Sequence, residues 1–157
     1  MNFPNLLLDN QLCFALYSAT NAITRYYRFY LKELGITYSQ YLVLIALWEG
    51  NCKNPSDIGK MLKLDLPTIT PILQKLEIMN LIKKSRSSED ERIVIVELTQ
   101  KGIDLEEEVA AIQDKVACKT GLAKAEFNTL KATLNDLTDA MEINATDVKN
   151  LKLNHCK

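Results

Sequence analysis

The sequence predicts a mainly α-helical protein: a winged helix-turn-helix with a two-stranded β-wing, and N- and C-terminal helices that form a dimerisation region. Three observations predict this architecture. Apolar residues recur at three- and four-residue spacing along most of the chain. Two short helical segments separated by a tight turn lie in its middle. A β-branched run at residues 92–98 follows them directly.

The composition is that of a folded globular protein. The chain has 157 residues, of which 47% are hydrophobic and 25% charged, and these values exclude disordered and low-complexity classes. No apolar run is long enough to span a membrane. No basic residue precedes the apolar Leu6-Leu7-Leu8, so the N-terminus is a poor signal peptide. We therefore expect a cytoplasmic protein with no membrane partner.

The residues present give little support to an enzyme. His155 is the only histidine, and the four cysteines (Cys13, Cys52, Cys118 and Cys156) form no CxxC pair. Phosphate-binding, dinucleotide-binding and HExxH motifs are absent from the sequence. We expect no enzymatic activity, no cofactor and no metal site, since the His155-Cys156 pair alone supplies only two ligands. Cys52, in a loop, and Cys156, in a tail, are interpreted as incidental.

The first two predicted helices differ in character. Spacing predicts a long amphipathic helix over residues 12–34, about 35 Å long, which exceeds what a small core needs. Asp9 or Asn10 is its expected cap, and Gly35 its expected stop. The second helix begins at the N-cap candidate Ser39 and is apolar nearly all round, so we expect it to be central.

Two short helices with a tight turn between them predict the helix-turn-helix. Asn54 caps the first of these, which has Pro55 in its first turn. The start of the second is ambiguous by one turn, between Pro67 and Thr70, because Pro71 would remove one backbone hydrogen bond from the longer helix.

Residues 81–85 and 92–98 are predicted as the two strands of the wing, joined by a polar tip at 86–91. Amphipathic helices are then predicted over 99–121 and from 125 to about 141. Residues 51–92 carry eight basic and six acidic groups, and the cluster of Lys83, Lys84 and Arg86 is compatible with nucleic-acid binding.

The terminal helices have apolar seams with no obvious partner in so small a core. Packing against a second copy would bury them, and two-fold dimers are the commonest solution. We therefore expect a homodimer of single-domain chains (1–157), with a winged helix-turn-helix at 36–98, dimerisation helices at 5–35 and 99–142, and a flexible tail at 143–157.

Over residues 5–142 the sequence resembles the MarR family of winged-helix regulators. The resemblance rests on Leu64-Asp65, Thr68 to Glu77, Asn80-Leu81-Ile82, Arg86-Ser87 with Asp90-Glu91-Arg92, and Leu98-Thr99-Gln100-Lys101-Gly102. Residues 8–17 and 34–38 are similar to the organic-hydroperoxide-sensing repressors, the OhrR branch. Leu66-Pro67 departs from that branch, which has a small Ser-Gly-like pair here, and this places the start of the recognition helix in question.

The resemblance implies a repressor that binds double-stranded DNA at a pseudo-palindromic operator. Its base-reading and backbone-binding groups would be Thr68, Thr70, Gln74 and Lys75 on the second short helix, which fits the major groove. Arg86, Ser87 and Arg92 would bind DNA from the wing, and Asp90 would hold the wing together. The alternative is that these residues bind no DNA and form only a solvent-exposed helix face and a charged hairpin tip.

The resemblance also implies that Cys13 is a reactive thiol served by two tyrosines, Tyr27 and Tyr38, and that Cys118 is its resolving cysteine. Cys13 and Tyr27 are fourteen residues apart on one helix, or about 21 Å along its axis. They cannot touch within one chain, so a contacting Tyr27 must come from a dimer partner. The alternative is that Cys13 is buried filler and Cys118 an ordinary surface residue.

The sequence thus predicts a homodimeric repressor that senses organic hydroperoxides. Oxidation would convert Cys13 to a sulfenic acid and then to an intersubunit disulfide with Cys118, releasing the operator. Two other functions remain open. One is a MarR-type regulator switched by a small aromatic ligand, with Cys13 inert. The other is a thiol peroxidase.

Overall fold

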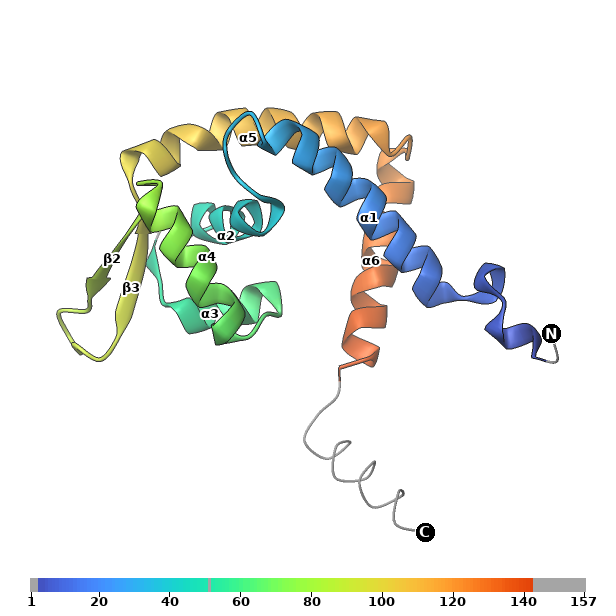
Figure 1. The fold of residues 1–157 in the computed structure, drawn as a ribbon, viewed down its shortest axis with the longest axis horizontal. Helices are drawn as coiled ribbons and strands as arrows, with labels where there is room; N and C mark the ends of the chain where they lie inside the picture. Colours follow the sequence, from blue (N-terminus) through green and yellow to red (C-terminus); the bar gives the residue numbers. More distant parts are fainter. Residues whose placement is uncertain (1–2, 51, 143–157) are drawn as a thin grey trace, which may run out of the picture. The chain divides into compact units, whose positions relative to one another are not determined.

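A computed structural model describes residues 3–50 and 52–142 (Figure 1). Its elements are η1 Pro4–Leu6, η2 Leu8–Asn10, α1 Leu12–Leu31, α2 Tyr38–Trp48, β1 Cys52–Lys53, α3 Pro55–Leu62, α4 Leu66–Ile78, β2 Ile82–Arg86, β3 Val94–Leu98, α5 Gln100–Lys119 and α6 Lys124–Ala140. The chain divides into two compact units after Val116, and each is considered by itself. The predicted tail at 143–157 lies outside the described residues.

The first helix begins at Leu12, as predicted, but the N-caps of the first two helices differ from the prediction. Asp9 and Asn10 do not cap α1, because they belong to the 3-10 turn η2, where the Asn10 side-chain amide donates to the Pro4 carbonyl at 2.8 Å. The N-cap of α1 is Gln11, with no side-chain capping bond. The N-cap of α2 is Thr37 rather than Ser39, because Thr37 and Gln40 form a reciprocal capping box.

The C-terminal end of α1 comes three residues earlier than predicted, at Leu31. Residues 32–35 continue as a turn, in which the Gly35 N–H donates to the Lys32 carbonyl at 3.1 Å. Gly35 has φ +71°, a left-handed conformation that glycine adopts without a steric penalty, and it is the predicted stop.

The first helix of the helix-turn-helix has the predicted cap. The Asp57 N–H donates to Asn54 Oδ1 at 2.9 Å, and Pro55 occupies the first turn of α3. The turn into α4 is tight: a Cβ on Gly59 would lie 2.8 Å from the Leu64 carbonyl oxygen. Glycine at this position therefore permits the close approach of the two helices.

The start of α4, ambiguous from the sequence, is at Leu66. Asp65 is the N-cap and its Oδ1 accepts from the Thr68 N–H at 3.1 Å, while Pro67 lies in the first turn. Hydrogen bonds from Thr68, first from its side chain and then from its backbone, hold the pKa of Asp65 below its usual value. The helix tolerates Pro71 in its interior. Leu66 and Pro67, which replace the small pair of the OhrR branch, are therefore compatible with a regular helix start.

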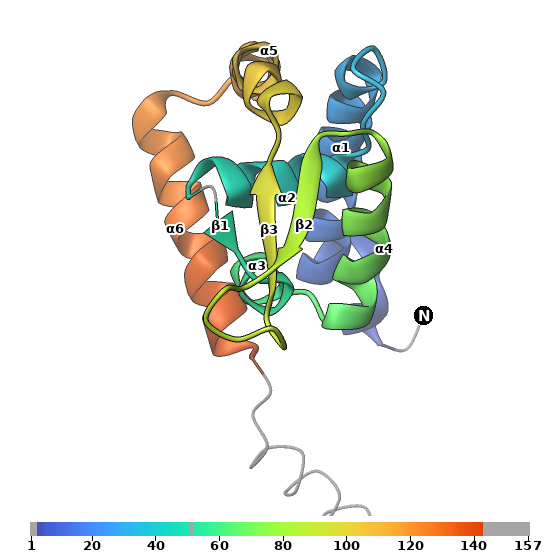
Figure 2. The ribbon, with the colours of Figure 1, turned by 90° about the vertical axis from the view of Figure 1, so that its left-hand side faces the viewer.

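The wing strands β2 and β3 pair antiparallel, with Lys83 opposite Glu97, as the predicted hairpin requires. The sequence prediction missed a third strand. β1 pairs with the other edge of β3, so that the sheet order is β1-β3-β2 (Figure 2). The interpretation of Cys52 as a loop residue was therefore wrong, since its backbone belongs to β1 and lies opposite Glu97.

The core of the first unit is built mainly from α2, α3, α4 and the sheet. Its side chains are nearly inaccessible to solvent and include Val43, Leu44, Leu47, Ile58, Ile69, Leu73, Leu76, Leu81 and Val96. In contrast, α1 contributes only Leu31 to the buried set, and no described residue of α6 is buried. Among residues 3–50 and 52–142, no helix is both long and apolar enough to cross a membrane.

Candidate nucleic-acid interface and thiol site

The two thiols expected to react lie near helix ends. Cys13 is the second residue of α1, and Cys118 lies in the last turn of α5. Both are free and exposed. Cys13 belongs to the first compact unit and Cys118 to the second. Both thiols are therefore accessible to a dissolved oxidant.

Tyr27 and Tyr38, the two tyrosines predicted to serve the thiol, lie together. Their ring centroids are 5.2 Å apart. A third ring, that of Tyr41, lies 5.0 Å from Tyr27 and 5.6 Å from Tyr38. The Tyr41 hydroxyl donates to the Tyr27 hydroxyl oxygen at 3.3 Å. We call Tyr27, Tyr38 and Tyr41 the tyrosine cluster.

Sequence reasoning missed Tyr41, although a signal was present. Tyr38 and Tyr41 are three residues apart on α2, and such residues share a helix face. Nearly all of α2 is apolar, however, so its tyrosines are easily read as core residues. Tyr41 is indeed buried, whereas Tyr27 and Tyr38 are partly exposed at the edge of the core.

Burial keeps two members of the cluster protonated. It raises the pKa of Tyr38, with a smaller contribution from nearby Tyr27. It raises the pKa of Tyr41 further, and the hydrogen bond to Tyr27 adds to this effect. Protonated phenols are hydrogen-bond donors, so the cluster can donate to an anion that reaches it.

The cluster and Cys13 do not meet within one chain. Cys13 and Tyr27 both lie on the continuous helix α1, about 21 Å apart along its axis. The structure therefore brings Tyr27 and Tyr38 together and leaves Cys13 a separate group within the chain.

The predicted DNA-reading residues lie on one side of α4. Thr68, Thr70, Gln74 and Lys75 are exposed, whereas Ile69, Leu73 and Leu76 face the core. The Thr70 hydroxyl donates to the Leu66 carbonyl at 2.8 Å, so its oxygen remains available chiefly as an acceptor. Gln74 and Lys75 are the longer side chains of the set, and they extend furthest from the helix.

Several hydrogen bonds close the wing tip, two of which involve residues predicted to act there. The backbone N–H of Arg92 donates to Asp90 Oδ1 at 2.9 Å, and Arg86 Nη1 donates to the Glu91 carbonyl at 3.0 Å. Asp90 is therefore placed to hold the turn, the role expected for it, through the backbone of Arg92. Both arginines are exposed and Ser87 is half-buried.

The basic cluster predicted at 83–86 is largely paired with carboxylates. Lys83 Nζ lies 3.2 Å from the cross-strand Glu97, and Lys84 Nζ lies 2.8 Å from Glu77 of α4. Exposed ion pairs of this kind add little stability, but they neutralise charge that would otherwise attract DNA. Lys75, Arg86 and Arg92, the other cationic residues predicted to bind DNA, are exposed.

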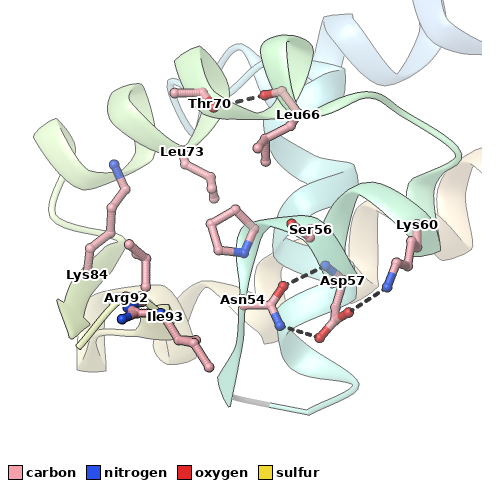
Figure 3. Close-up of a pocket in the computed structure, with 12 residues that line it drawn as sticks. Asn54, Ser56, Asp57, Lys60, Leu66, Thr70, Leu73, Lys84, Arg92 and Ile93 are labelled. Carbon is pink, nitrogen blue, oxygen red and sulfur yellow. Dashed lines mark hydrogen bonds and ion pairs between the residues drawn. The ribbon is translucent and has the colours of Figure 1, made fainter. Parts of the chain in front are cut away.

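A cavity of about 570 Å³ lies between α3, α4 and the wing (Figure 3). At its α3 edge, Asn54 Nδ2 donates to Asp57 Oδ2 at 2.6 Å, and Lys60 pairs with Asp57 at 3.4 Å. Polar groups from the other elements also line it, namely those of Thr70, Lys84 and Arg92. In the part of the chain that the structure describes, no group of three side chains is arranged to hold a metal ion.

The combination of an exposed polar α4 and a closed wing agrees with the comparison with known proteins. Residues 25–109 match the family described as Transcriptional regulator SarA/Rot. The chain is also 37% identical over 139 residues to the organic hydroperoxide resistance transcriptional regulator of Bacillus subtilis (strain 168), covering 88% of this chain and 95% of that protein. The chain belongs to the SarA/Rot and MarR-type winged-helix transcriptional regulators.

Solved structures of this family include close matches to the fold. The reduced form of AbfR, a Staphylococcus epidermidis protein, bound to DNA has a TM-score of 0.74 and 34% identity, covering 90% of this chain and 96% of that one. The disulfide form of AbfR has a TM-score of 0.62 and 37% identity, covering 83% and 92%. This MarR-type chain is accordingly a DNA-binding transcriptional regulator, and the proteins of its family are regulators rather than enzymes.

Proposed function

We propose that the protein is a homodimeric repressor that binds a pseudo-palindromic operator and releases it when an organic hydroperoxide oxidises Cys13. The observation that carries this proposal is the preformed tyrosine cluster, whose phenols have no thiol beside them among the described residues of their own chain. In a dimer, a reactive thiol of the partner chain that lies beside the cluster would accept hydrogen bonds from these hydroxyl groups.

Dimerisation is supported by apolar side chains that the chain itself leaves uncovered. On and before α1 these include Leu8, Leu12 and Tyr17, with exposed fractions of 62%, 61% and 65%. Large apolar side chains that lie exposed along one segment are typical of association surfaces. We assign residues 5–35 and 99–142 to dimerisation and 36–98 to DNA binding. Antiparallel α1 helices across the two-fold axis would bring Cys13 of one chain toward Tyr27 of the other.

The redox step needs only the thiol and the hydroperoxide. The Cys13 thiolate attacks an oxygen of the hydroperoxide, an S–O bond forms and the O–O bond breaks, and the alkoxide leaves as an alcohol after taking a proton. Cys13 is then a sulfenic acid, oxidised by two electrons. Phenol donors of the partner, those of Tyr27 and Tyr38, would stabilise the thiolate before attack. Exposed Phe14 and Tyr17 nearby favour an oxidant with an organic group.

The second step would form the disulfide. The Cys118 thiolate of the partner chain attacks the sulfur of oxidised Cys13, an S–S bond forms and hydroxide leaves as water. One hydroperoxide is thus consumed for one disulfide. AbfR, which resembles this chain, has been solved reduced on DNA and with a disulfide, which supports a redox switch of this kind.

DNA release by an organic hydroperoxide tests the proposal. Reduced protein selects a duplex from a random-sequence pool, and binding is followed by fluorescence anisotropy while cumene hydroperoxide is added in equal amount to the thiol. The parent should lose about 100-fold in affinity, which corresponds to about 2.7 kcal/mol. Cys13→Ser should stay bound, and Cys52→Ser, the matched control, should behave like the parent. Equal release from Cys13→Ser would contradict the proposal.

A second candidate function is a switch operated by a small aromatic ligand, and the cavity between α3, α4 and the wing favours it. Arg92 supplies positive charge and Leu66, Leu73 and Ile93 supply apolar surface to that cavity, whereas the charge of Lys84 is paired with Glu77. Release of DNA from Cys13→Ser by a benzoate-type acid would support this function. Steady-state consumption of hydroperoxide beyond about one equivalent per Cys13 thiol would instead indicate a thiol peroxidase.

A further inference from the structure

The C-terminal end of α4 is held by the first turn of α5. Three consecutive carbonyl groups follow α4, and all three accept hydrogen bonds from Thr99, the residue before α5, or from Lys101 in its first turn. The Met79 carbonyl accepts from Lys101 Nζ at 3.0 Å and the Asn80 carbonyl accepts from the Thr99 hydroxyl at 2.7 Å. The Leu81 carbonyl accepts from the Thr99 backbone N–H at 3.1 Å. These three carbonyls lie beyond the last residue of α4, whose own final carbonyls already accept from the N–H groups of residues 79–81, so Thr99 and Lys101 partner the segment that leaves the helix.

Gly102 completes this junction. Its N–H donates to the Thr99 hydroxyl oxygen at 3.2 Å, which fixes that hydroxyl toward Asn80. Its carbonyl accepts from Trp48 Nε1, at the end of α2, at 3.1 Å. A Cβ on Gly102 would overlap the Leu81 carbonyl oxygen, so glycine permits the contact. Ends of α2, α4 and α5 therefore meet at one place.

We propose that Thr99, Lys101 and Gly102 form a clamp that fixes the direction of α4 relative to α5. Hydrogen bonds to consecutive carbonyls restrict rotation of α4 as well as its translation. The winged helix-turn-helix then turns as one body with residues 100–116 of α5, which belong to the same compact unit, and Cys118 follows in the last turn of that helix. This inference rests on the proposed function, because the movement that the clamp transmits would begin with the disulfide at Cys118.

The test compares clamp variants with a matched control on the same turn. Thr99→Val and Lys101→Met each remove a donor of the clamp. Gln100→Ala is the control, because the Gln100 amide donates to Asp104 within α5 and not to α4. We expect the clamp variants to bind DNA about fivefold more weakly when reduced. Their ratio of oxidised to reduced Kd should contract from about 100-fold to below about 10-fold, while Gln100→Ala and the rescue variant Thr99→Ser keep the parental values.

Salt dependence separates a positioning role from a direct contact with DNA. If Lys101 acts through α4, the slope of log affinity against log salt concentration stays parental in Lys101→Met. A slope reduced by about 0.9 would mean that Lys101 binds a phosphate, and this result would overturn the clamp. Parental affinity and release in both clamp variants would overturn it as well. If hydroperoxide fails to release even the parent, the proposed function fails, and the reduced-state affinities alone decide the clamp.

Trp48 reports on the same junction by its fluorescence. It is the only tryptophan of the chain, and its indole N–H donates to Gly102. A junction that moves as one body keeps the emission maximum of the parent unchanged when hydroperoxide releases DNA. Thr99→Val should shift the emission to the red in the reduced state, because water reaches the loosened indole. A red shift of the parent on oxidation would overturn the rigid coupling.

Discussion

The hydroxyl groups of Tyr27 and Tyr41 are 3.3 Å apart and join α1 to α2 by a hydrogen bond. The hydroxyl of Tyr41 is the donor, which leaves the hydrogen of Tyr27 available to another acceptor. Tyr27 is only partly buried, so that acceptor can come from outside the chain. In the proposed dimer it is the thiolate of the partner's Cys13.

Replacing Tyr27 with phenylalanine should therefore slow the oxidation of Cys13. Loss of one hydrogen bond to a charged group costs about 1.5–3 kcal/mol, so we expect the rate constant with cumene hydroperoxide to fall about tenfold or more. The rate is measured by thiol titration against time. Tyr26→Phe, the neighbouring position outside the cluster, is the control and should react at the parental rate. Equal slowing of both variants would show that the effect is not specific to the cluster.

Stability at alkaline pH should depend on the tyrosine cluster. Burial raises the pKa of Tyr38 and Tyr41 above the ordinary value of 10.0, so the folded chain favours their neutral forms. Their contribution to stability is complete below about pH 10 and is lost as the pH rises from there toward the raised folded values. Urea unfolding between about pH 8 and pH 11 should show this loss. Tyr41→Phe should flatten it, and the exposed control Tyr17→Phe should not; an unflattened loss in Tyr41→Phe would be evidence against this account.

Lys75 and Arg86 should contribute to DNA binding through phosphates. Lys75→Ala or Arg86→Ala removes one positive charge from α4 or from the wing, and each should weaken binding at any sequence. If each binds one phosphate, the salt slope falls by about 0.9 per variant. Titration at several salt concentrations measures this change. Lys32→Ala, just after α1, is the control. Parental affinity and slope in both variants would place the DNA-binding surface elsewhere.

Asp90 should act on DNA binding through the shape of the wing. Asp90→Ala removes the acceptor of the Arg92 N–H and loosens the tip, so we expect operator affinity to fall about fivefold. Asp90→Asn keeps an acceptor oxygen and removes the negative charge, so it should bind at least as well as the parent. Anisotropy titrations compare the two variants. Weakening by Asp90→Asn alone would argue for a role of the charge itself.

Regular elements were predicted well because their signals are local. Asn54 and Pro55 mark the start of α3, and the prediction of this start is confirmed by the capping bond to Asp57. The wing strands were recognisable from β-branched alternation, and they pair as a hairpin. The periodicity of α5 and α6 also placed these helices within a few residues of their observed bounds.

Features that depend on contacts distant in sequence were missed. The two residues of β1 are too few for any pattern, and only pairing with β3 makes them a strand. The start of α1 at residue 12 was predicted, but its cap was not, because a bond to Pro4 and the turn η2 engage Asp9 and Asn10. The ion pair between Lys83 and Glu97 was not predicted, because it depends on the register of β2 against β3.

The candidate site was predictable in part. The fourteen-residue separation of Cys13 and Tyr27 follows from helix geometry alone, and the continuous helix α1 agrees with it. The role of Tyr41 could not be predicted from the sequence, because its hydroxyl meets the Tyr27 hydroxyl only when α1 packs on α2.

The reaction of Cys13 in mixed dimers tests the central claim most directly. Chains with Tyr27→Phe keep Cys13, and chains with Cys13→Ser keep Tyr27; each is slow or inert by itself. In a mixed dimer the remaining Cys13 faces the intact Tyr27 of its partner. We predict that mixing the two variants restores a fast phase with the parental rate constant toward cumene hydroperoxide. A mixture in which every thiol reacts as slowly as in Tyr27→Phe would contradict the proposed contact between chains.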